Sequence, residues 1–181
     1  MDIKDFTIQN KNKIIAILFI LLVAFIFYWI TFDIRFRMYS INENKYYQII
    51  NKNSGKCLDV PGSASDNNVK IIQYDATGSA NQLWKFVYVS KGLYKIKNKY
   101  SEKCLDIINE SGVTYLVQNQ DNNGPNQKWI LRKSGGGFYF IASSASNKFL
   151  DVPQSSKNSG EKIILYAQTN NDNQMWDIIK K

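Results

Sequence analysis

The sequence predicts an all-β domain built from three similar units and preceded by a single apolar helix that crosses a membrane. Three observations lead to this fold class: a motif that occurs three times at nearly constant spacing, short β-type segments between turn-forming residues, and one long stretch without charge near the amino terminus. We expect a short tail, a transmembrane helix, a linker and a β domain, at residues 1–13, 14–32, 33–45 and 46–181.

The repeated motif is a Leu-Asp pair followed, after a short strand with polar flanks, by Asn-Gln-x-Trp. The pairs are Leu58-Asp59, Leu105-Asp106 and Leu150-Asp151, and the matching tryptophans are Trp84, Trp129 and Trp176. Successive aspartates lie 47 and 45 residues apart, and successive tryptophans lie 45 and 47 apart. A period near 46 residues is typical of repeat architectures. We therefore expect repeats at 46–90, 91–135 and 136–181.

Each repeat is expected to form four short strands. In the first repeat they are predicted at 46–50, 56–60, 69–74 and 83–88, separated by segments rich in Gly, Pro, Asn, Asp and Ser, which favour turns. Three copies are too few for a propeller and favour pseudo-threefold closure, with about twelve strands sharing one barrel. The three tryptophans are expected in its core, because a large aromatic residue that recurs in an apolar setting is usually buried.

The segment from Ile14 to Phe32 contains no charged residue and would extend about 28 Å as a helix, close to the thickness of a hydrocarbon core. A cleaved secretory signal is the alternative reading, since Lys11 and Lys13 precede the segment. However, the apolar stretch is long for such a signal and no small-residue cleavage site follows it. We expect a single-pass signal anchor. Basic residues on both flanks barely set its orientation, but a short tail before one span favours an extracytoplasmic repeat domain.

The composition argues against several classes of function. The net charge is +8, but the lysines are scattered without a basic stripe or an aromatic RNA-binding motif, so no nucleic-acid partner is expected. The chain has no histidine, the commonest general base and a frequent zinc ligand, and no phosphate-binding loop. The motif aspartates are symmetry-related and too far apart for a glycosidase pair. We expect no enzymatic activity, no cofactor and no metal.

Two cysteines, Cys57 and Cys104, occupy the same position in the first two repeats, and Phe149 replaces them in the third. This replacement indicates a buried apolar position. Residues in different repeats do not meet the Cα spacing of a disulfide, about 4.4–6.8 Å. We expect two free thiols, although export usually favours disulfides.

The triple Leu-Asp and Asn-Gln-x-Trp pattern resembles the ricin B-type lectin family, whose fold is the β-trefoil. The resemblance covers Tyr46 to Lys181. It implies carbohydrate binding, often of galactose-type sugars, by the aspartate, an aromatic residue seven positions before the asparagine, and the asparagine itself, while the adjacent glutamine helps to hold the aspartate. The matching residues are Asp59, Tyr74, Asn81 and Gln82 in repeat one and Asp151, Tyr166, Asn173 and Gln174 in repeat three.

These residue types suit a sugar, which offers a ring face of C–H groups and a rim of hydroxyls. An aromatic ring can cover the face, and carboxylate and amide groups can pair with the rim. Repeat two has Asn119 where the others have tyrosine, and its loop is two residues shorter. We expect its site to be degenerate; the residues concerned are Asp106, Asn119, Asn126 and Gln127. For Asp59 and Asp151 the alternative interpretation is a carboxylate that only caps a turn, because repeat two keeps Asp106 without the aromatic residue.

Two functions remain open at this point. The first is a membrane-anchored lectin-like module that binds glycans through two shallow sites, which are weak singly and gain avidity when clustered. The second is a protein-interaction scaffold with degenerate sugar sites, which tethers an unidentified protein partner at the membrane. No motif in the sequence excludes the second.

Overall fold

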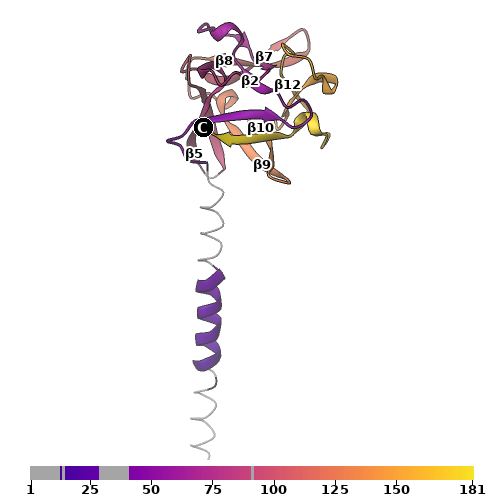
Figure 1. Ribbon diagram of the computed structural model, residues 1–181. Coiled ribbons are helices and arrows are strands. Elements are labelled where there is room, and N and C mark those ends of the chain that lie inside the picture. Colours follow the sequence, from indigo (N-terminus) through magenta and orange to yellow (C-terminus); the bar gives the residue numbers. More distant parts are fainter. Residues whose placement is uncertain (1–12, 14, 29–40, 91) are drawn as a thin grey trace, which may run out of the picture. The chain divides into compact units, whose positions relative to one another are not determined.

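The structure is a computed structural model and describes residues 13, 15–28, 41–90 and 92–181. The chain forms two compact units, Met1–Ile41 and Asn42–Lys181. In the first unit residues 13 and 15–28 are helical (Figure 1). Within the described part of the chain, no helix has the length and apolar character needed to cross a membrane. The expected transmembrane segment also includes residues 14 and 29–32, which lie outside the described residues, as do most of the expected tail and linker.

The second unit is built from strands and short 3-10 turns. Its described residues form thirteen strands: β1 Tyr47–Asn51, β2 Cys57–Asp59, β3 Val69–Lys70, β4 Ile72–Tyr74, β5 Trp84–Ser90, β6 Leu93–Asn98, β7 Cys104–Glu110, β8 Val113–Asn119, β9 Trp129–Gly135, β10 Phe138–Ser143, β11 Phe149–Asp151, β12 Ile164–Tyr166 and β13 Trp176–Lys180. The 3-10 turns are η1 Pro61–Ser63, η2 Ala80–Gln82, η3 Pro125–Gln127, η4 Pro153–Ser155 and η5 Asp172–Gln174.

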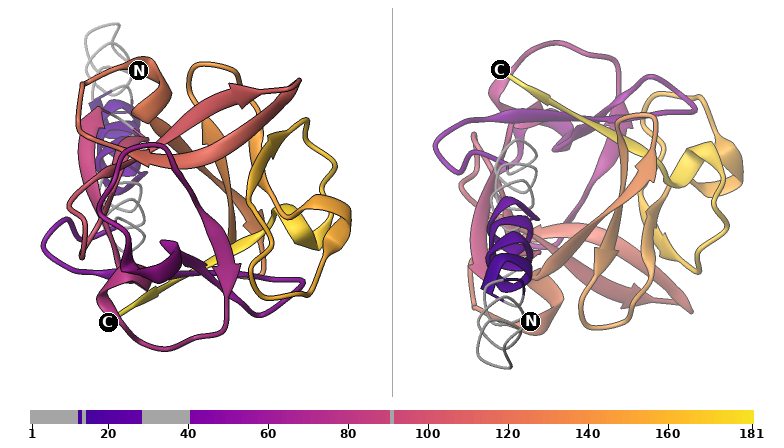
Figure 2. Two further views of the ribbon diagram at one scale, coloured as in Figure 1. Left: turned by 90° about the horizontal axis from the view of Figure 1, so that it is seen from above. Right: turned by 90° about the horizontal axis from the view of Figure 1, so that it is seen from below.

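Six of the strands close into a barrel. In order around the ring they are β1, β5, β6, β9, β10 and β13, and β13 pairs with β1 to complete the circle; all six pairings are antiparallel. Each repeat supplies two of these strands, as the pseudo-threefold expectation requires. Figure 2 views the strands from above and from below. Among the strands that the structure describes, this closure leaves no free barrel edge for another chain to pair with.

The remaining strands form three hairpins, β2–β4, β7–β8 and β11–β12, which meet around the pseudo-threefold axis. Three buried residues, one from each repeat, join them through a ring of backbone hydrogen bonds. Ile71 N donates to Leu116 O at 2.9 Å, Leu116 N to Ile163 O at 3.0 Å, and Ile163 N to Ile71 O at 2.9 Å. This ring binds the hairpins of all three repeats to one another.

The three motif tryptophans are fully buried between the barrel and the hairpins. Each indole Nε1 donates to the carbonyl of the leucine in the Leu-Asp pair of its own repeat. The distances are 2.9 Å from Trp84 to Leu58, 3.2 Å from Trp129 to Leu105 and 3.3 Å from Trp176 to Leu150. Because the only polar atom of each indole is paired, the rings contribute apolar burial without an unsatisfied donor.

The strand pattern differs from the expectation in the first repeat, where the strand expected at 69–74 is divided into β3 and β4 by Ile71. The reason is the ring at the axis, which takes the backbone N–H and C=O of Ile71 out of the local ladder. Repeat two differs in another way: β7 and β8 run on into a tight turn at Ser111 and Gly112. Cys57 and Cys104 are free and buried, as expected.

Candidate functional site

Two hollows of about 390 Å³ each lie at equivalent places in repeats one and three, and we call them site one and site three. Site one is lined by Asp59, Pro61, Gly62, Ser63, Ile72, Tyr74, Thr77, Ser79 and Asn81. Site three is lined by Asp151, Pro153, Gln154, Ser155, Ile164, Tyr166, Thr169, Asn171 and Asn173. Every residue of the second set lies 92 positions after its counterpart in the first. The structure thus brings together, in repeats one and three, the aspartate, tyrosine and asparagine that were predicted from the sequence to form a site.

The aspartates are held through one carboxylate oxygen only. Oδ2 of Asp59 accepts hydrogen bonds from Asn81 Nδ2 at 3.0 Å and Gln82 Nε2 at 2.8 Å. In site three the same bonds to Asp151 Oδ2 are 3.0 and 2.8 Å long. Among the residues that the structure describes, no donor lies within hydrogen-bonding distance of Oδ1 of either aspartate. Each site therefore keeps one carboxylate oxygen available as an acceptor for a ligand.

The glutamines lie behind the aspartates and do not line the hollows. Besides Asp59, Gln82 Nε2 donates to the carbonyl of Asp75 at 2.7 Å, and its Oε1 accepts from Thr77 N at 2.8 Å. Gln174 makes the equivalent bonds to the backbone of the third repeat. These side chains fix both the carboxylate and the loop after the tyrosine. The glutamines therefore position the aspartates and do not themselves line the hollows.

The asparagines can only accept hydrogen bonds from a ligand, because both protons of each amide are already used. Nδ2 of Asn81 donates to Asp59 and to the carbonyl of Val60 at 3.0 Å. Nδ2 of Asn173 makes the same pair of bonds. The expected use of the amide as both donor and acceptor is thus reduced to its oxygen. Oδ1 of Asn173 is buried and has no partner among the described residues.

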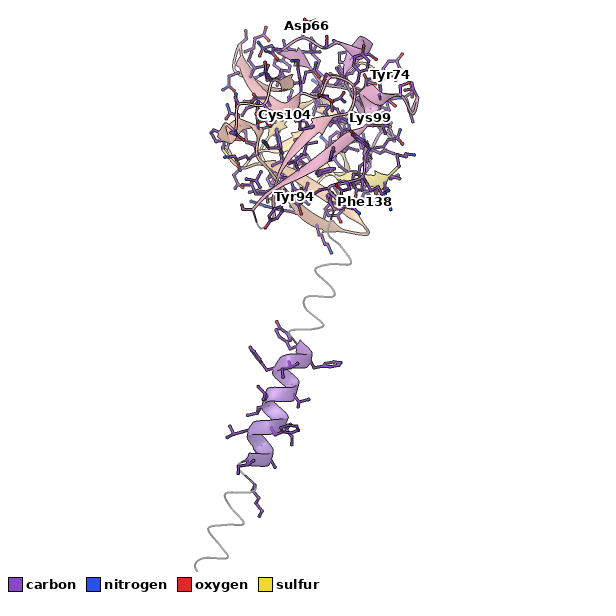
Figure 3. The ribbon with its side chains drawn as sticks, turned by 90° about the vertical axis from the view of Figure 1, so that its left-hand side faces the viewer. Asp66, Tyr74, Tyr94, Lys99, Cys104 and Phe138 are labelled. Carbon is purple, nitrogen blue, oxygen red and sulfur yellow. The ribbon has the colours of Figure 1, made fainter. Side chains whose placement is uncertain are left out.

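The tyrosines provide an apolar surface at the rim of each hollow. Tyr74 ends β4 opposite Cys57, and Tyr166 ends β12 opposite Phe149. Their exposed fractions are 43% and 55% (Tyr74 is labelled in Figure 3). The fold does not bury these rings, so they remain free to stack on a ligand.

Burial raises the pKa of Asp59, and hydrogen bonds from Gln82 and Asn81 lower it in part. The pKa of Asp151 is raised by burial in the same way, against the bonds from Gln174 and Asn173. Removal from water disfavours the charged form more than two amide donors favour it. A hydroxyl donor placed on the free oxygen of either carboxylate would favour the charged form.

Sequence reasoning missed several residues that line the hollows. Thr77 and Thr169 stand five residues before the motif glutamine in repeats one and three, where repeat two has Asn122. Pro61 and Pro153 begin the 3-10 turns η1 and η4, whose second and third residues also line the sites. The signal was present in the sequence: Asp-Val-Pro occurs only after the first and third Leu, and repeat two reads Asp-Ile-Ile.

Repeat two places its residues differently. Oδ2 of Asp106 accepts from Gln127 at 2.9 Å and from Asn119 at 3.3 Å, while its Oδ1 accepts from the backbone N of Ile107 at 2.7 Å. Asn119 lies opposite Cys104, the position that Tyr74 and Tyr166 occupy in their hairpins, and takes over the bond made elsewhere by the motif asparagine. Asn126 is exposed. The aspartate of this repeat has neither a free oxygen nor an aromatic neighbour at the equivalent place.

Residues 45–176 match the family described as the ricin-type beta-trefoil lectin domain. The match covers most of the chain and all three repeats. The chain belongs to this family. Membership in the ricin-type lectin family accounts for the all-β trefoil.

Solved structures with similar folds include a designed, threefold-symmetric protein, ThreeFoil. It is 34% identical, with a TM-score of 0.71, and the match covers 74% of this chain and 97% of that one. The C-terminal half of an earthworm R-type lectin, solved in complex with GalNAc, is 27% identical with a TM-score of 0.61; the match covers 76% of this chain and 99% of the lectin.

Among curated proteins, an exo-beta-1,6-galactobiohydrolase of Bifidobacterium longum subsp. longum is 24% identical over 146 residues. The match covers 73% of this chain but only 10% of the enzyme. The ricin-type lectin described here therefore spans about a tenth of the length of that relative.

Proposed function

We propose that this chain is a membrane-attached lectin that binds galactose-type sugars through site one and site three. The observation that carries the proposal is the free Oδ1 of Asp59 and of Asp151, each in a hollow bordered by an exposed tyrosine. The carboxylate oxygen accepts the rim hydroxyls of the sugar, and the tyrosine covers its ring face. In site one, Oδ1 of Asn81 accepts a further hydroxyl.

The preference for galactose-type sugars is supported by two relatives. The earthworm lectin was solved with GalNAc, and the bacterial relative is named as a galactobiohydrolase. The proposed sites are shallow, so each binds a single sugar weakly and two sites on one chain raise the avidity for a glycan with several termini. The chain binds and does not cleave; catalysis belongs to any partner enzyme.

The membrane attachment rests on the uncharged run from Ile14 to Phe32. The proposed arrangement has this segment in the bilayer and the trefoil on the extracytoplasmic side, where it meets glycans. Alkaline carbonate extraction of cell membranes should leave the full chain in the pellet, and protease added to intact cells should remove the trefoil. Release by carbonate, or protection of the trefoil in intact cells, would contradict this arrangement.

Glycan-array binding of residues 41–181 tests the two-site proposal. Asp59→Ala and Asp151→Ala should each weaken binding, and the double variant should abolish it. Asp106→Ala is the matched control, since it removes an equivalent buried carboxylate from the repeat without a site, and it should leave glycan binding unchanged. Undiminished binding by the double variant would refute the proposal.

A further inference from the structure

The loop of site one is held by a side chain from the next repeat. Gln118, on β8 of repeat two, is fully buried, and its Nε2 donates to the carbonyls of Ala64 at 2.9 Å and Asp66 at 3.0 Å. Its Oε1 accepts a hydrogen bond of 2.7 Å from Oγ of Ser101. Residues 64 and 66 directly follow η1, which lines site one. The amide thus ties the loop of repeat one to the hairpin of repeat two.

The loop of site three is held in the same way, by repeat one. Gln73 on β4 is fully buried and donates through Nε2 to the carbonyls of Ser156 at 3.0 Å and Asn158 at 2.9 Å. Its Oε1 accepts from Oγ of Ser54 at 2.7 Å. The three residues bonded to Gln73 occupy positions equivalent to the three bonded to Gln118. Repeat two thus holds the loop of repeat one, and repeat one holds the loop of repeat three in the same way.

A second buried amide from the neighbouring repeat holds the other side of each site. Nδ2 of Asn98 in repeat two donates to the carbonyl of Asn81 at 2.9 Å. Nδ2 of Asn51 in repeat one donates to the carbonyl of Asn173 at 2.9 Å. Each hollow is thus flanked by two amide contacts from the repeat that follows it around the axis.

Repeat three, which would hold repeat two, lacks both amides. The position of Gln73 and Gln118 is Leu165, and the position of Asn51 and Asn98 is Ser143. Repeat two correspondingly has no loop to hold, since β7 and β8 are joined by a tight turn, and its motif asparagine is exposed. Repeats one and two carry both amides, and each holds a repeat that has a hollow. Repeat three lacks them, and the repeat that it would hold has no hollow of this kind among the described residues.

We propose that the two sugar sites are composite between repeats, with Gln118 and Asn98 as positioning residues for site one and Gln73 and Asn51 as positioning residues for site three. Repeat two, which binds no sugar itself, is then necessary for the sugar site of repeat one. The inference rests on the proposed sugar binding for its ligand, but the restraint on the loops is independent of any ligand.

A crossed experiment tests this with the full chain and methyl β-galactoside as the probe. Asp151→Ala isolates site one and Asp59→Ala isolates site three. Adding Gln118→Leu should weaken binding about tenfold in the first background and leave it unchanged in the second, because an unrestrained loop must be ordered on binding. Gln73→Leu should give the opposite pattern. Leucine is the residue that repeat three itself carries at this position.

Hydrogen exchange of the unliganded full chain provides the readout that does not need sugar. Gln118→Leu should accelerate exchange at residues 61–68 and spare 153–160, and Gln73→Leu should do the reverse. If a leucine variant does not fold, Ser101→Ala and Ser54→Ala remove the hydroxyl that orients each glutamine, together with the bond that this hydroxyl accepts from the backbone N of Lys103 or Lys56. These variants should weaken the same sites about threefold. Equal effects on both sites, or none on exchange, would overturn the proposal. Crossed exchange without sugar binding by the wild type would uphold the restraint and refute the lectin function.

Discussion

Asp106 and Ile107 are joined by a hydrogen bond of 2.7 Å from the backbone N of Ile107 to Oδ1 of Asp106. The corresponding oxygen of Asp59 and of Asp151 has no donor among the described residues. The difference follows from the hairpin: β7 continues past Asp106, whereas β2 and β11 end at their aspartates and lead into a 3-10 turn. The same Leu-Asp motif therefore yields a free acceptor in two repeats and an occupied one in the third.

Restoring the missing tyrosine should not restore a site in repeat two. We expect Asn119→Tyr, made in the Asp59→Ala and Asp151→Ala double background, to bind no sugar. The aromatic ring would return, but Asp106 Oδ1 stays occupied and the turn that lines the other sites is absent. Isothermal titration with methyl β-galactoside measures this. Binding by the variant would show that the tyrosine alone decides which repeats are active.

Sugar binding should weaken as the solution becomes mildly acidic. Burial raises the pKa of Asp59 and Asp151 above the ordinary aspartate value of about 3.9. Since the charged carboxylate is the better acceptor, affinity should fall as the pH drops through this raised pKa. Titrations between about pH 7 and pH 4 should show the loss in both the Asp59→Ala and the Asp151→Ala single variants.

Unfolding would not explain that loss. A carboxyl whose pKa is raised by folding binds its proton more tightly in the folded state, so between the unfolded and folded pKa values its contribution favours folding more as the pH falls. The carboxyls that oppose this are ion-paired ones such as Asp121, whose pKa Lys95 lowers, and their effect comes below the ordinary aspartate value. Tryptophan fluorescence should therefore stay native while binding declines. A simultaneous loss of both signals would contradict the assignment.

The fold and the gathering of the selected residues in repeats one and three could be predicted because they depend on residues that recur. Three buried tryptophans at one period require three equivalent environments, and their indoles bond equivalent carbonyls. The absence of tyrosine from repeat two was visible in the same comparison. The aspartate, tyrosine and asparagine of repeat one, and those of repeat three, meet in one hollow because the hairpin and the 3-10 turn of a repeat adjoin each other.

Features that depend on contacts between repeats, or on how far a strand extends, could not be predicted. The division of the strand at Ile71 results from a backbone ring that involves all three repeats. The state of Asp106 Oδ1 depends on how far β7 extends, which a Leu-Asp pair does not reveal. In the sequence, Gln73 and Gln118 look like ordinary strand residues. Their role depends on the loops of another repeat, to whose carbonyls their side chains donate hydrogen bonds.

Both thiols should be unreactive in the folded protein. Burial raises the pKa of Cys57 and of Cys104 to about 11, so almost no thiolate exists at pH 8. We expect iodoacetamide to leave both residues unmodified in native protein and to modify both in guanidinium chloride under reducing conditions. Mass spectrometry of the intact chain counts the adducts. Rapid native alkylation of either residue would mean that its hairpin opens on the time scale of the reaction.

Gly62 and Gln154 should respond oppositely to an exchange of residues. They occupy the same place in η1 and η4 with φ of 60° and 54°, a left-handed conformation that favours glycine. No atom lies within 4 Å of a Cβ placed on Gly62, so only the backbone opposes a side chain there. Gly62→Gln should lower the free energy of unfolding by about 1 kcal/mol, and Gln154→Gly should raise it by up to about the same amount.

Urea unfolding followed by tryptophan fluorescence measures both changes. The indoles of Trp84, Trp129 and Trp176 are buried in the core, so their signal reports unfolding of the whole domain and not the substituted turns themselves. The double exchange, with glutamine at 62 and glycine at 154, should come close to wild-type stability, since the two turns share no residue and their effects should add. A loss of stability in both single variants would mean that Gln154 makes a stabilising contact that outweighs its backbone strain.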